Sequence, residues 1–383
     1  MGSWNNKLLP LAAQYLQFLG TAQHSTDEIS KAFYNIACNF NVNATNEVTT
    51  VSITGLQENF DRAVTMFEDV LHNCLPDTAA LAGLKDRLMK SRANSKLNKQ
   101  AIMQGLISYA RYGSKNPFNS GLTNEEIASL KAEDLVKILH SLLDYSHTII
   151  YYGPLSQDAF TTDITKLHPL PAAFASYPEK SRFPFTQQTA NQVLFANYDM
   201  VQSEICWIRN AAPYDVTKEP IVDVFDNYFG GGMGSIVFQT LRESKALAYS
   251  TFATYGTPAK KEDPFYILAY IGCQADKMND AIGGMNELLT TLPESQQAFT
   301  LARTSQKKDI ETERYTQDGI IFAYLAAKQK GLDYDDRKDE YEALDKLTMA
   351  DVKGFHQQQV SGKAYTYCVV ASEKKIKQDD LKK

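Results

Sequence analysis

Two side chains near the middle of the sequence have types and a spacing that suit catalysis. Arg242 carries a cation, and Tyr249, seven residues later, carries a hydroxyl that can donate a hydrogen bond. A fixed donor beside a cation stabilises an oxygen that becomes negatively charged during a reaction. The plain alternatives are a solvated arginine paired with Glu243 and a half-buried tyrosine on a strand.

The stretch from Thr217 to Gly256 predicts the elements that position this pair. Thr217 is suited to cap a first helix, and the run Gly230–Gly232 stops it, because glycines cost backbone entropy in a helix and readily take positive φ. Ser235 can cap a second helix that carries Arg242. From Leu247 the apolar period becomes two, which predicts a strand with one face formed by Tyr249, Thr251, Ala253 and Tyr255.

The glycine-rich turn does not match a phosphate-binding loop. Such a loop needs a lysine followed by Ser or Thr after a buried strand, whereas this turn follows a helix and has Ser235 without a lysine. We expect the turn to let the second helix pack closely and to aim Arg242.

The segment GGGMGS followed by VFQTLRESKALAY resembles the C-terminal half of the insulinase/pitrilysin-like zinc metallopeptidases. In that family the Arg and the Tyr lie opposite a zinc ion that the other half of the enzyme binds. The resemblance implies that Tyr249 donates to the oxygen of the scissile carbonyl and that Arg242 holds a substrate carbonyl. It also implies a peptide-binding surface, which we assign to Gly231, Gly232, Ser235 and Tyr255.

The zinc-binding motif of the family is missing. Family enzymes carry His-x-x-Glu-His just before Phe-x-Gly-Thr, and Phe18–Thr21 matches the second part. Leu11 and Tyr15 stand at the histidine positions and Gln14 at the glutamate position, and a glutamine amide cannot take a proton from water. The resemblance therefore implies a zinc ion in a partner half and none bound by this chain.

Other candidate metal ligands are scattered. The segment 87–124 contains no Asp, Glu or His, so a downstream third ligand is also missing. It carries seven basic residues, which indicate a solvated face or, alternatively, a basic wall that attracts acidic peptides.

The cysteines show no paired spacing and are expected to be buried free thiols: Cys38, Cys74, Cys206, Cys273 and Cys368.

Composition sets broad limits. The 383 residues are 44% hydrophobic and 22% charged, as in soluble globular proteins, and no apolar run is long enough to cross a bilayer. A net charge of −6 disfavours nucleic acid as a partner. The start Met1-Gly2-Ser3 lacks the features of a signal peptide and resembles an expression start, so the sequence leaves the compartment open.

The length and an internal repeat predict two α+β domains. The segments 51–71 and 268–289 share a strand, a Gly-x-Gln and an amphipathic helix, about 217 residues apart. A proline-rich stretch from His168 to Pro184 indicates a linker, so we predict domains at 1–175 and 191–383 with a linker at 176–190. The resemblance implies that each domain is a mainly antiparallel sheet with helices on one face.

Two local patterns in the first domain also give predictions. The asparagine-rich segment 39–46 is expected to turn, and the segment 147–152 is expected to be a strand that ends at Gly153-Pro154.

The sequence thus favours the substrate-binding half of a zinc metallopeptidase, with peptides as substrates and a zinc-bearing N-terminal half as partner. That half would lie upstream in the same natural chain or on another subunit. Two alternatives stay open. One is a catalytically silent scaffold or regulatory subunit of the same family, and the other is a free-standing peptide-binding module.

Overall fold

A computed structural model describes residues 1–376, and they form two compact units. Unit 1 comprises Met1–Ser95 and Ser120–Arg182, and unit 2 comprises Lys96–Asn119 and the residues from Phe183 on. The chain therefore passes from unit 1 to unit 2 for the last time inside the predicted linker 176–190. The segment Lys96–Asn119 lies in unit 2, although the predicted first domain includes it.

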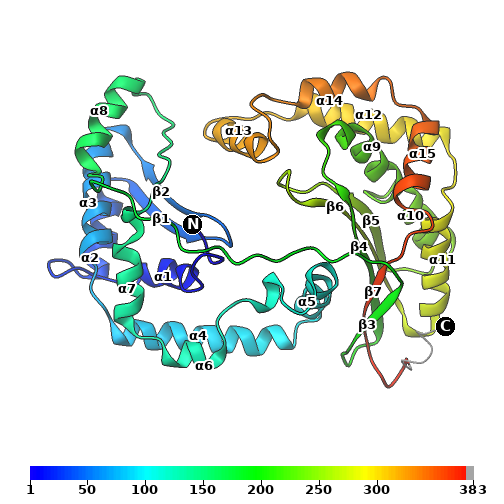
Figure 1. Cartoon of the computed structure of the whole chain (residues 1–383), viewed down its shortest axis with the longest axis horizontal. Coiled ribbons are helices and arrows are strands. Elements are labelled where there is room, and N and C mark those ends of the chain that lie inside the picture. Colours follow the sequence, from blue (N-terminus) through cyan, green and yellow to red (C-terminus); the bar gives the residue numbers. More distant parts are fainter. Residues whose placement is uncertain (377–383) are drawn as a thin grey trace. The chain divides into compact units, whose positions relative to one another are not determined.

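Unit 1 is mostly helical with one small sheet (Figure 1). Its elements are α1 (Leu9–Leu16), α2 (Thr26–Asn35), β1 (Cys38–Ala44), β2 (Thr49–Gly55), α3 (Phe60–Asn73), α4 (Thr78–Lys96, whose last residue falls in unit 2), α6 (Asn124–Ser129), α7 (Ala132–His140) and α8 (Gln157–Leu167). Strands β1 and β2 pair antiparallel. The core packs side chains of α1, α3 and α7 against this hairpin.

Two local predictions for unit 1 are wrong. The asparagine-rich segment 39–46, expected to turn, forms most of strand β1, because Cys38 and Val42 bury their side chains while the asparagines stay at least partly exposed. The segment 147–152, expected to be a strand, is not one. Among the described residues of unit 1 the only strands are β1 and β2, so the β-branched and aromatic residues of this segment have no neighbouring strand with which to share ladder hydrogen bonds.

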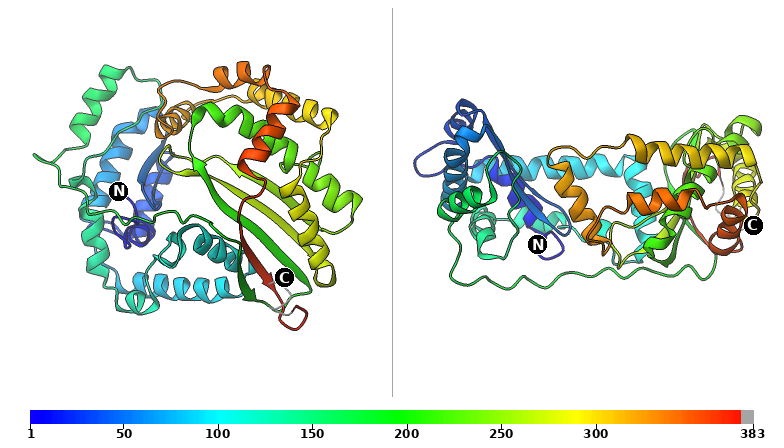
Figure 2. Two further views of the ribbon diagram at one scale, coloured as in Figure 1. Left: turned by 45° about the vertical axis from the view of Figure 1, so that its right-hand side comes forward. Right: turned by 90° about the horizontal axis from the view of Figure 1, so that it is seen from above.

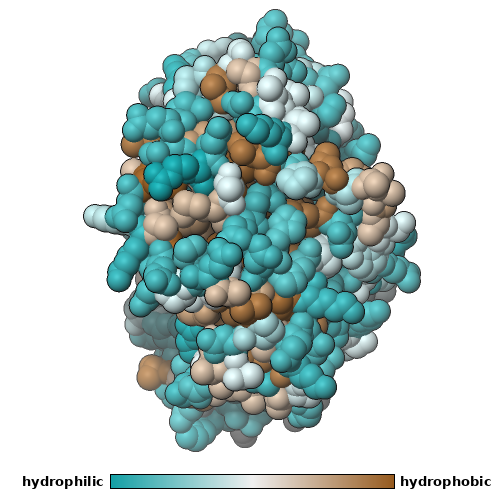
Figure 3. Space-filling model, turned by 90° about the vertical axis from the view of Figure 1, so that its left-hand side faces the viewer, coloured by the Kyte–Doolittle hydropathy of each residue, from teal (hydrophilic) through white to brown (hydrophobic). Residues whose placement is uncertain are grey.

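The surface of unit 1 that carries α2, α3, α7 and α8 is turned towards the viewer in Figure 3, where hydrophilic side chains separate several apolar groups. Within residues 1–376, no helix combines the length and the apolar character that crossing a bilayer requires.

Unit 2 is built on a five-stranded sheet (Figure 1). Its elements are α5 (Lys99–Tyr112), β3 (Gln192–Asn197), β4 (Gln202–Pro213), α9 (Glu219–Phe229), α10 (Ile236–Phe238), the π-helical segment η5 (Gln239–Ser244), β5 (Ser250–Gly256), β6 (Pro264–Gln274), η6 (Ala275–Lys277), α11 (Met278–Thr290), α12 (Gln296–Thr312), α13 (Gly319–Gln329), α14 (Arg337–Leu344), α15 (Met349–Gln359) and β7 (Thr366–Ala371).

The strand order of this sheet is β3-β7-β4-β6-β5. All neighbours pair antiparallel except β3 with β7, which are parallel. The predicted α+β class with a mainly antiparallel sheet is therefore confirmed.

The two faces of the sheet are covered differently, as Figures 1 and 2 show. One face packs its side chains, among them the fully buried Trp207, against α9, α11, α12 and α15. The other face is covered by α5, where Met103 and Ala110 contact Cys206 and Val370. The helices of the predicted second domain thus pack on one face of its sheet, as expected, and the second face is covered by α5, a helix from the first half of the sequence.

The predicted repeat corresponds to matching elements. In unit 1, β2, a 3-10 turn and α3 follow one another, and in unit 2, β6, η6 and α11 follow in the same order. In unit 1, Nε2 of His140 on α7 lies 3.1 Å from the carbonyl oxygen of Cys74, just after α3. In unit 2, Nε2 of His356 on α15 lies 3.0 Å from the carbonyl oxygen of Leu288 on α11. Both histidines thus have the same structural role in the two units.

A partly buried group of acidic side chains joins α9 to α14. Burial raises the pKa of the Asp223 carboxyl to about 8, and repulsion from Glu340 and Glu219 adds to this shift. Burial also raises the pKa of Glu340, which accepts a hydrogen bond from Gln306 (2.8 Å). Lys330 pairs with Glu219 at 2.9 Å and supplies a nearby cation.

The raised pKa of Asp223 predicts a pH-dependent stability. The Asp223 carboxyl stays protonated up to about pH 8 in the folded state but only up to about pH 4 in the unfolded state. Its contribution to the free energy of unfolding is therefore fully present at acid pH and is lost as the pH rises from about 4 to about 8. The variant Asp223→Asn should gain free energy of unfolding at pH 8, on the order of 2 kcal/mol, and little at pH 4. Urea unfolding of both proteins at pH 4, 6 and 8 measures this, and parallel curves for the two proteins would contradict it.

Candidate functional site

The glycine-rich turn brings the end of α9 against strand β5. A Cβ atom added to Gly230 would lie 2.2 Å from the carbonyl oxygen of Ala253, so only glycine allows this approach. The Asp226 carboxylate on α9 accepts the backbone N–H of Tyr255 (2.9 Å) and fastens the same two elements. Gly230 has a φ of −145°, so close packing, and not the predicted positive φ, is the reason for glycine here.

The second helix consists of α10 and the π-helical segment η5 that continues it. Ser235 caps it by accepting the N–H of Phe238, as predicted. Its last turns, η5, are π-helical, with one extra residue per turn, and such segments are frequent at functional sites. Arg242 lies in this segment, with its side chain about half exposed.

The connection from Arg242 to Tyr249 is held by backbone contacts. Ala246 takes a positive φ of 49°, and the N–H of Leu247 returns to the carbonyl of Leu241 at 2.8 Å. Tyr249 then donates its N–H to the carbonyl of Gly272 on β6 (2.9 Å), directly before β5 begins. The backbone on both sides of the seven-residue spacing is thus anchored.

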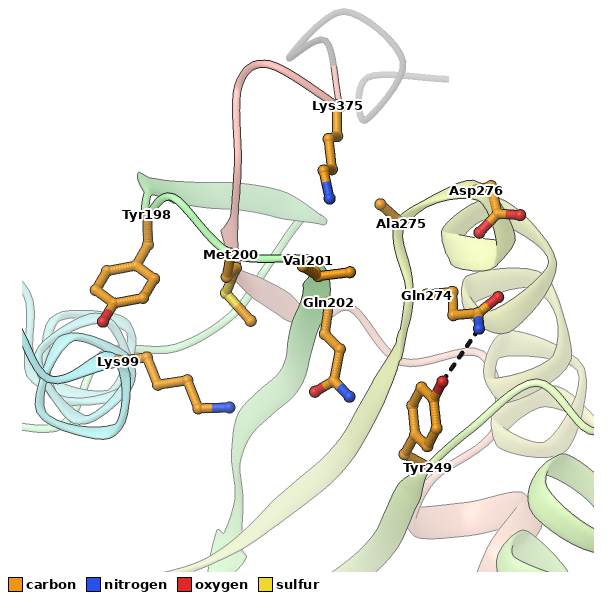
Figure 4. A pocket seen from close by; sticks show the side chains of 10 residues that line it. All are labelled: Lys99, Tyr198, Met200, Val201, Gln202, Tyr249, Gln274, Ala275, Asp276 and Lys375. Atoms are coloured by element: carbon orange, nitrogen blue, oxygen red, sulfur yellow. Dashed lines mark hydrogen bonds between the residues drawn. The ribbon is translucent and has the colours of Figure 1, made fainter.

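Tyr249 is the exposed member of its strand face. Thr251, Ala253 and Tyr255 on that face are buried, whereas Tyr249 is 55% exposed. Its hydroxyl accepts a hydrogen bond from Nε2 of Gln274 at 3.1 Å (Figure 4). Because the oxygen is the acceptor in that contact, the hydroxyl proton is left to donate elsewhere.

The Tyr249 side chain lines an open cavity of about 760 Å³ within unit 2. Polar groups from distant parts of the sequence line it as well: Lys99, Gln202, Gln274, Asp276 and Lys375. Figure 4 shows the phenol ring on one wall with its hydroxyl towards Gln274. The predicted donor is therefore accessible to a ligand.

Arg242 is accessible too, but it does not line this cavity. Its Nε lies 3.7 Å from Oε1 of Glu243, and its guanidinium lies over the ring of Phe238, 4.9 Å from the ring centre. The contact with Glu243 is the plain alternative that the sequence left open. Since both side chains of this ion pair are about half exposed, the pair contributes little and leaves the guanidinium free to exchange partners.

The other predicted binding residues differ in their exposure. Gly231 and Gly232 are exposed, and a Cβ on Gly232 would meet open space. Ser235 is buried, and its hydroxyl contacts the carbonyl of Gly232 and the N–H of Phe238. Tyr255 is 3% exposed and packs on Phe265 and Phe355, so its ring belongs to the core and cannot serve as the predicted peptide contact.

The residues at the zinc-motif position do not fit a zinc ion. Leu11 and Tyr15 are buried on α1, and Gln14 on the same helix is exposed. The Tyr15 hydroxyl donates to the carbonyl of Asp77 (2.6 Å) and accepts its N–H (2.8 Å), which gives this side chain a structural role. In the part of the chain that the structure describes, no three His, Cys, Asp or Glu side chains are grouped to hold a metal ion.

Two groups of polar residues carry little signal in the sequence. One is the set of cavity residues around Tyr249, of which Gln274 is a position of the internal repeat and Lys99 is one of the basic residues of segment 87–124, whereas Gln202, Asp276 and Lys375 belong to no pattern. The other is a chain in unit 1, where Glu68 lies 2.7 Å from Nδ1 of His168, whose Nε2 lies 2.8 Å from Nε2 of His147. Separations of 100 and 21 residues give no motif that would bring these groups together.

Comparisons with known proteins agree with this architecture. The sequence model described as "Insulinase (Peptidase family M16)" matches residues 13–124, and the model described as "Peptidase M16 inactive domain" matches residues 159–305. The chain belongs to the insulinase family. Within this family the second match covers the end of unit 1 and the part of unit 2 that carries the glycine turn, Arg242 and Tyr249.

Curated relatives of this insulinase-family chain are distant. It is 25% identical over 284 residues to "Uncharacterized zinc protease YmxG" of Bacillus subtilis, covering 73% of this chain and 67% of that protein. It is 22% identical over 263 residues to "Uncharacterized zinc protease" of Rickettsia felis, covering 67% of this chain and 61% of that protein.

Solved structures share the fold at low identity. The "peptidase M16 inactive domain from Pseudomonas fluorescens" superposes with a TM-score of 0.69 at 15% identity, covering 97% of this chain and 90% of that one. The ferredoxin protease FusC, solved as a mutant in complex with Arabidopsis ferredoxin, gives 0.75 at 13% identity, and the periplasmic protease PqqL of Escherichia coli gives 0.70 at 13%. The match covers 97% of this chain but only 40% and 41% of those two.

Proposed function

We propose that this chain is the substrate-binding half of a zinc metalloendopeptidase of the insulinase/pitrilysin type. It would complete the peptide-cleavage site opposite a zinc-bearing half that lies in the same natural chain or on another subunit. The observation that carries the proposal is the state of Tyr249. Its hydroxyl is exposed in a cavity, is oriented by Gln274 and has its proton free to donate.

The roles of the two side chains follow from their chemistry. The Tyr249 hydroxyl donates to the scissile carbonyl oxygen as that oxygen gains negative charge, and its anchored backbone limits the reorganisation that this donation needs. Arg242 exchanges Glu243 for a substrate carbonyl, which a half-exposed guanidinium can do at low cost. Zinc, the attacking water and the general base belong to the partner half, since the residues at the motif position here do not fit a metal ion.

The comparisons support a two-part enzyme. Two relatives are named zinc proteases, and PqqL and FusC are more than twice as long as the part that matches this chain. The alternative is a catalytically silent scaffold or regulatory subunit of the same family. The contact between Arg242 and Glu243 favours that alternative, because it occupies the arginine within its own helix.

Mixing the two halves separates these functions. We expect a fluorogenic peptide to be cleaved when this chain is added to an insulinase-family half that carries His-x-x-Glu-His, and not by either half alone. Removing zinc with a chelator should abolish turnover, as should Glu→Gln in the motif of the partner. A stable complex that shows no turnover, measured by gel filtration and peptide assay, would contradict the proposal and indicate the scaffold.

A further inference from the structure

The cavity beside Tyr249 collects hydrogen-bond donors from four separate parts of unit 2. Lys99 begins α5, Gln202 begins β4, Gln274 ends β6, and Lys375 follows β7. Figure 4 shows Lys99 and Lys375 on two sides of Met200 and Val201, with the Lys375 ammonium directed towards Val201 and the amide of Gln202 between Lys99 and Tyr249. Donors that converge from separate elements are typical of a ligand site.

The charge in the cavity favours an anion. The ammonium groups of Lys99 and Lys375 line it together with one carboxylate, that of Asp276. A second carboxylate, that of Glu204, pairs with Lys99, so Lys375 supplies most of the positive charge that a ligand meets. Figure 4 shows the Asp276 carboxylate at the rim beside η6, away from the space between the two lysines. A ligand that enters between Lys99 and Lys375 therefore meets donors before it meets an acid.

An ion pair with the buried Glu204 holds the Lys99 side chain in place. Its ammonium pairs with Glu204, whose side chain is 7% exposed, while the Lys99 side chain itself is 39% exposed. Burial, with the neighbouring Glu204 adding to it, raises the pKa of the Tyr270 hydroxyl, which keeps that group a neutral partner of the glutamate. Because an ammonium has three donors and Glu204 takes one, Lys99 has donors left for a ligand.

The remaining wall limits what fits. Tyr198, Met200 and Val201, from the connection between β3 and β4, add largely apolar surface at the side of Lys99. A short side chain with an apolar stem and an anionic head matches a cavity that is apolar on one wall and cationic at two points.

We propose that this cavity is a carboxylate-binding subsite that selects peptides with an acidic residue beside the bond presented to Tyr249. The placement beside the cleaved bond rests on the proposed peptidase function, whereas carboxylate binding by this chain does not. Lys99 and Lys375 supply the charge, and Gln202 and Gln274 supply neutral donors. The carboxylate comes from an Asp or Glu side chain or from the C-terminus of the peptide.

Equilibrium binding to the full chain alone tests the subsite. Four labelled decapeptides are compared by fluorescence anisotropy at low ionic strength: one with a central Glu, one with Gln in its place, and each with a free or an amidated C-terminus. We expect the Glu peptides to bind about tenfold more tightly than the Gln peptides, the size of one charged hydrogen bond. A tenfold loss on amidation instead identifies the peptide C-terminus as the source.

Matched variants assign the effect to the cavity. Lys375→Met should reduce the tenfold preference to about twofold, whereas Lys374→Met, which removes the neighbouring ammonium paired with Asp199, should keep it. Because Lys99→Met alone would leave Glu204 buried without its partner, it is combined with Glu204→Gln and should also reduce the preference. Equal binding of all four peptides, or a preference that survives Lys375→Met, overturns the subsite.

The two proposals fail separately. If the mixed halves cleave nothing while the chain still prefers carboxylates, the peptidase function is wrong and the carboxylate site stands. If cleavage occurs without any preference for acidic peptides, the subsite is wrong and the peptidase function stands.

Discussion

Replacing Tyr249 with phenylalanine is expected to lower kcat for peptide cleavage by the mixed halves about 100-fold, while the Kd for peptide changes less than about twofold. The ring and its packing are kept, and the lost hydroxyl is a donor that strengthens its hydrogen bond only as the carbonyl oxygen gains charge. Single-turnover cleavage with excess enzyme, together with peptide binding to each variant, separates the two quantities.

A second Tyr→Phe change provides the control. Tyr34, 84% exposed in unit 1, is remote in sequence from the site and lines no part of the cavity. Tyr34→Phe should leave kcat within about twofold of the wild type. Equal kcat values for Tyr249→Phe and wild type would remove the role assigned to the hydroxyl, even if cleavage by the mixed halves is real.

Replacing Gly230 with alanine is expected to lower the free energy of unfolding of unit 2 by about 3 kcal/mol, at the upper end for overpacked sites. The added Cβ would lie 2.2 to 2.6 Å from three backbone atoms of Ala253, and backbone cannot yield as a flexible side chain can. Removing this clash requires the end of α9 to move away from β5, and that movement strains the hydrogen bond that the Tyr255 N–H donates to the Asp226 carboxylate. Urea unfolding followed by circular dichroism measures the loss.

Gly232→Ala is the matched control, two residues along the same turn. A Cβ there meets no atom within 4 Å, and its φ lies outside the left-handed region. We expect it to be neutral or to stabilise by about 0.5 kcal/mol, because alanine restricts the unfolded chain. Similar losses for both variants would show that flexibility of the turn, and not its approach to Ala253, explains the glycines.

Local patterns predicted most of the elements around Arg242 and Tyr249. The predicted cap of the first helix is wrong, because Thr217 does not cap α9 but donates its N–H and its hydroxyl to Asp215. Ser235 caps its helix because a hydroxyl at that position satisfies a free N–H, and β5 alternates because its even and odd residues meet different surroundings. These effects act within a few residues, so the sequence displays them directly. The exposure of Tyr249 was not predictable in this way, since the other members of its strand face are buried.

The cavity could not be predicted because its residues meet only in the folded unit. Lys99 and Lys375 are 276 residues apart in sequence, and although Lys99 belongs to the basic segment 87–124, nothing in the sequence links that segment to Lys375. The same reason explains the errors in unit 1. Whether the segment 147–152 becomes a strand depends on a partner strand elsewhere, and its own β-branched and aromatic residues carry no information about that partner.

The place of α5 has a consequence for the order in which the protein can fold during synthesis. This helix leaves the ribosome more than 70 residues before β3 and about 250 residues before β7, the strands it must cover. Its apolar side can contact β4 earlier, but it has its full set of partners only once β7 has been made. Unit 2 is thus completed by two segments that lie about 250 residues apart in sequence, which makes its assembly slow compared with that of a domain contiguous in sequence.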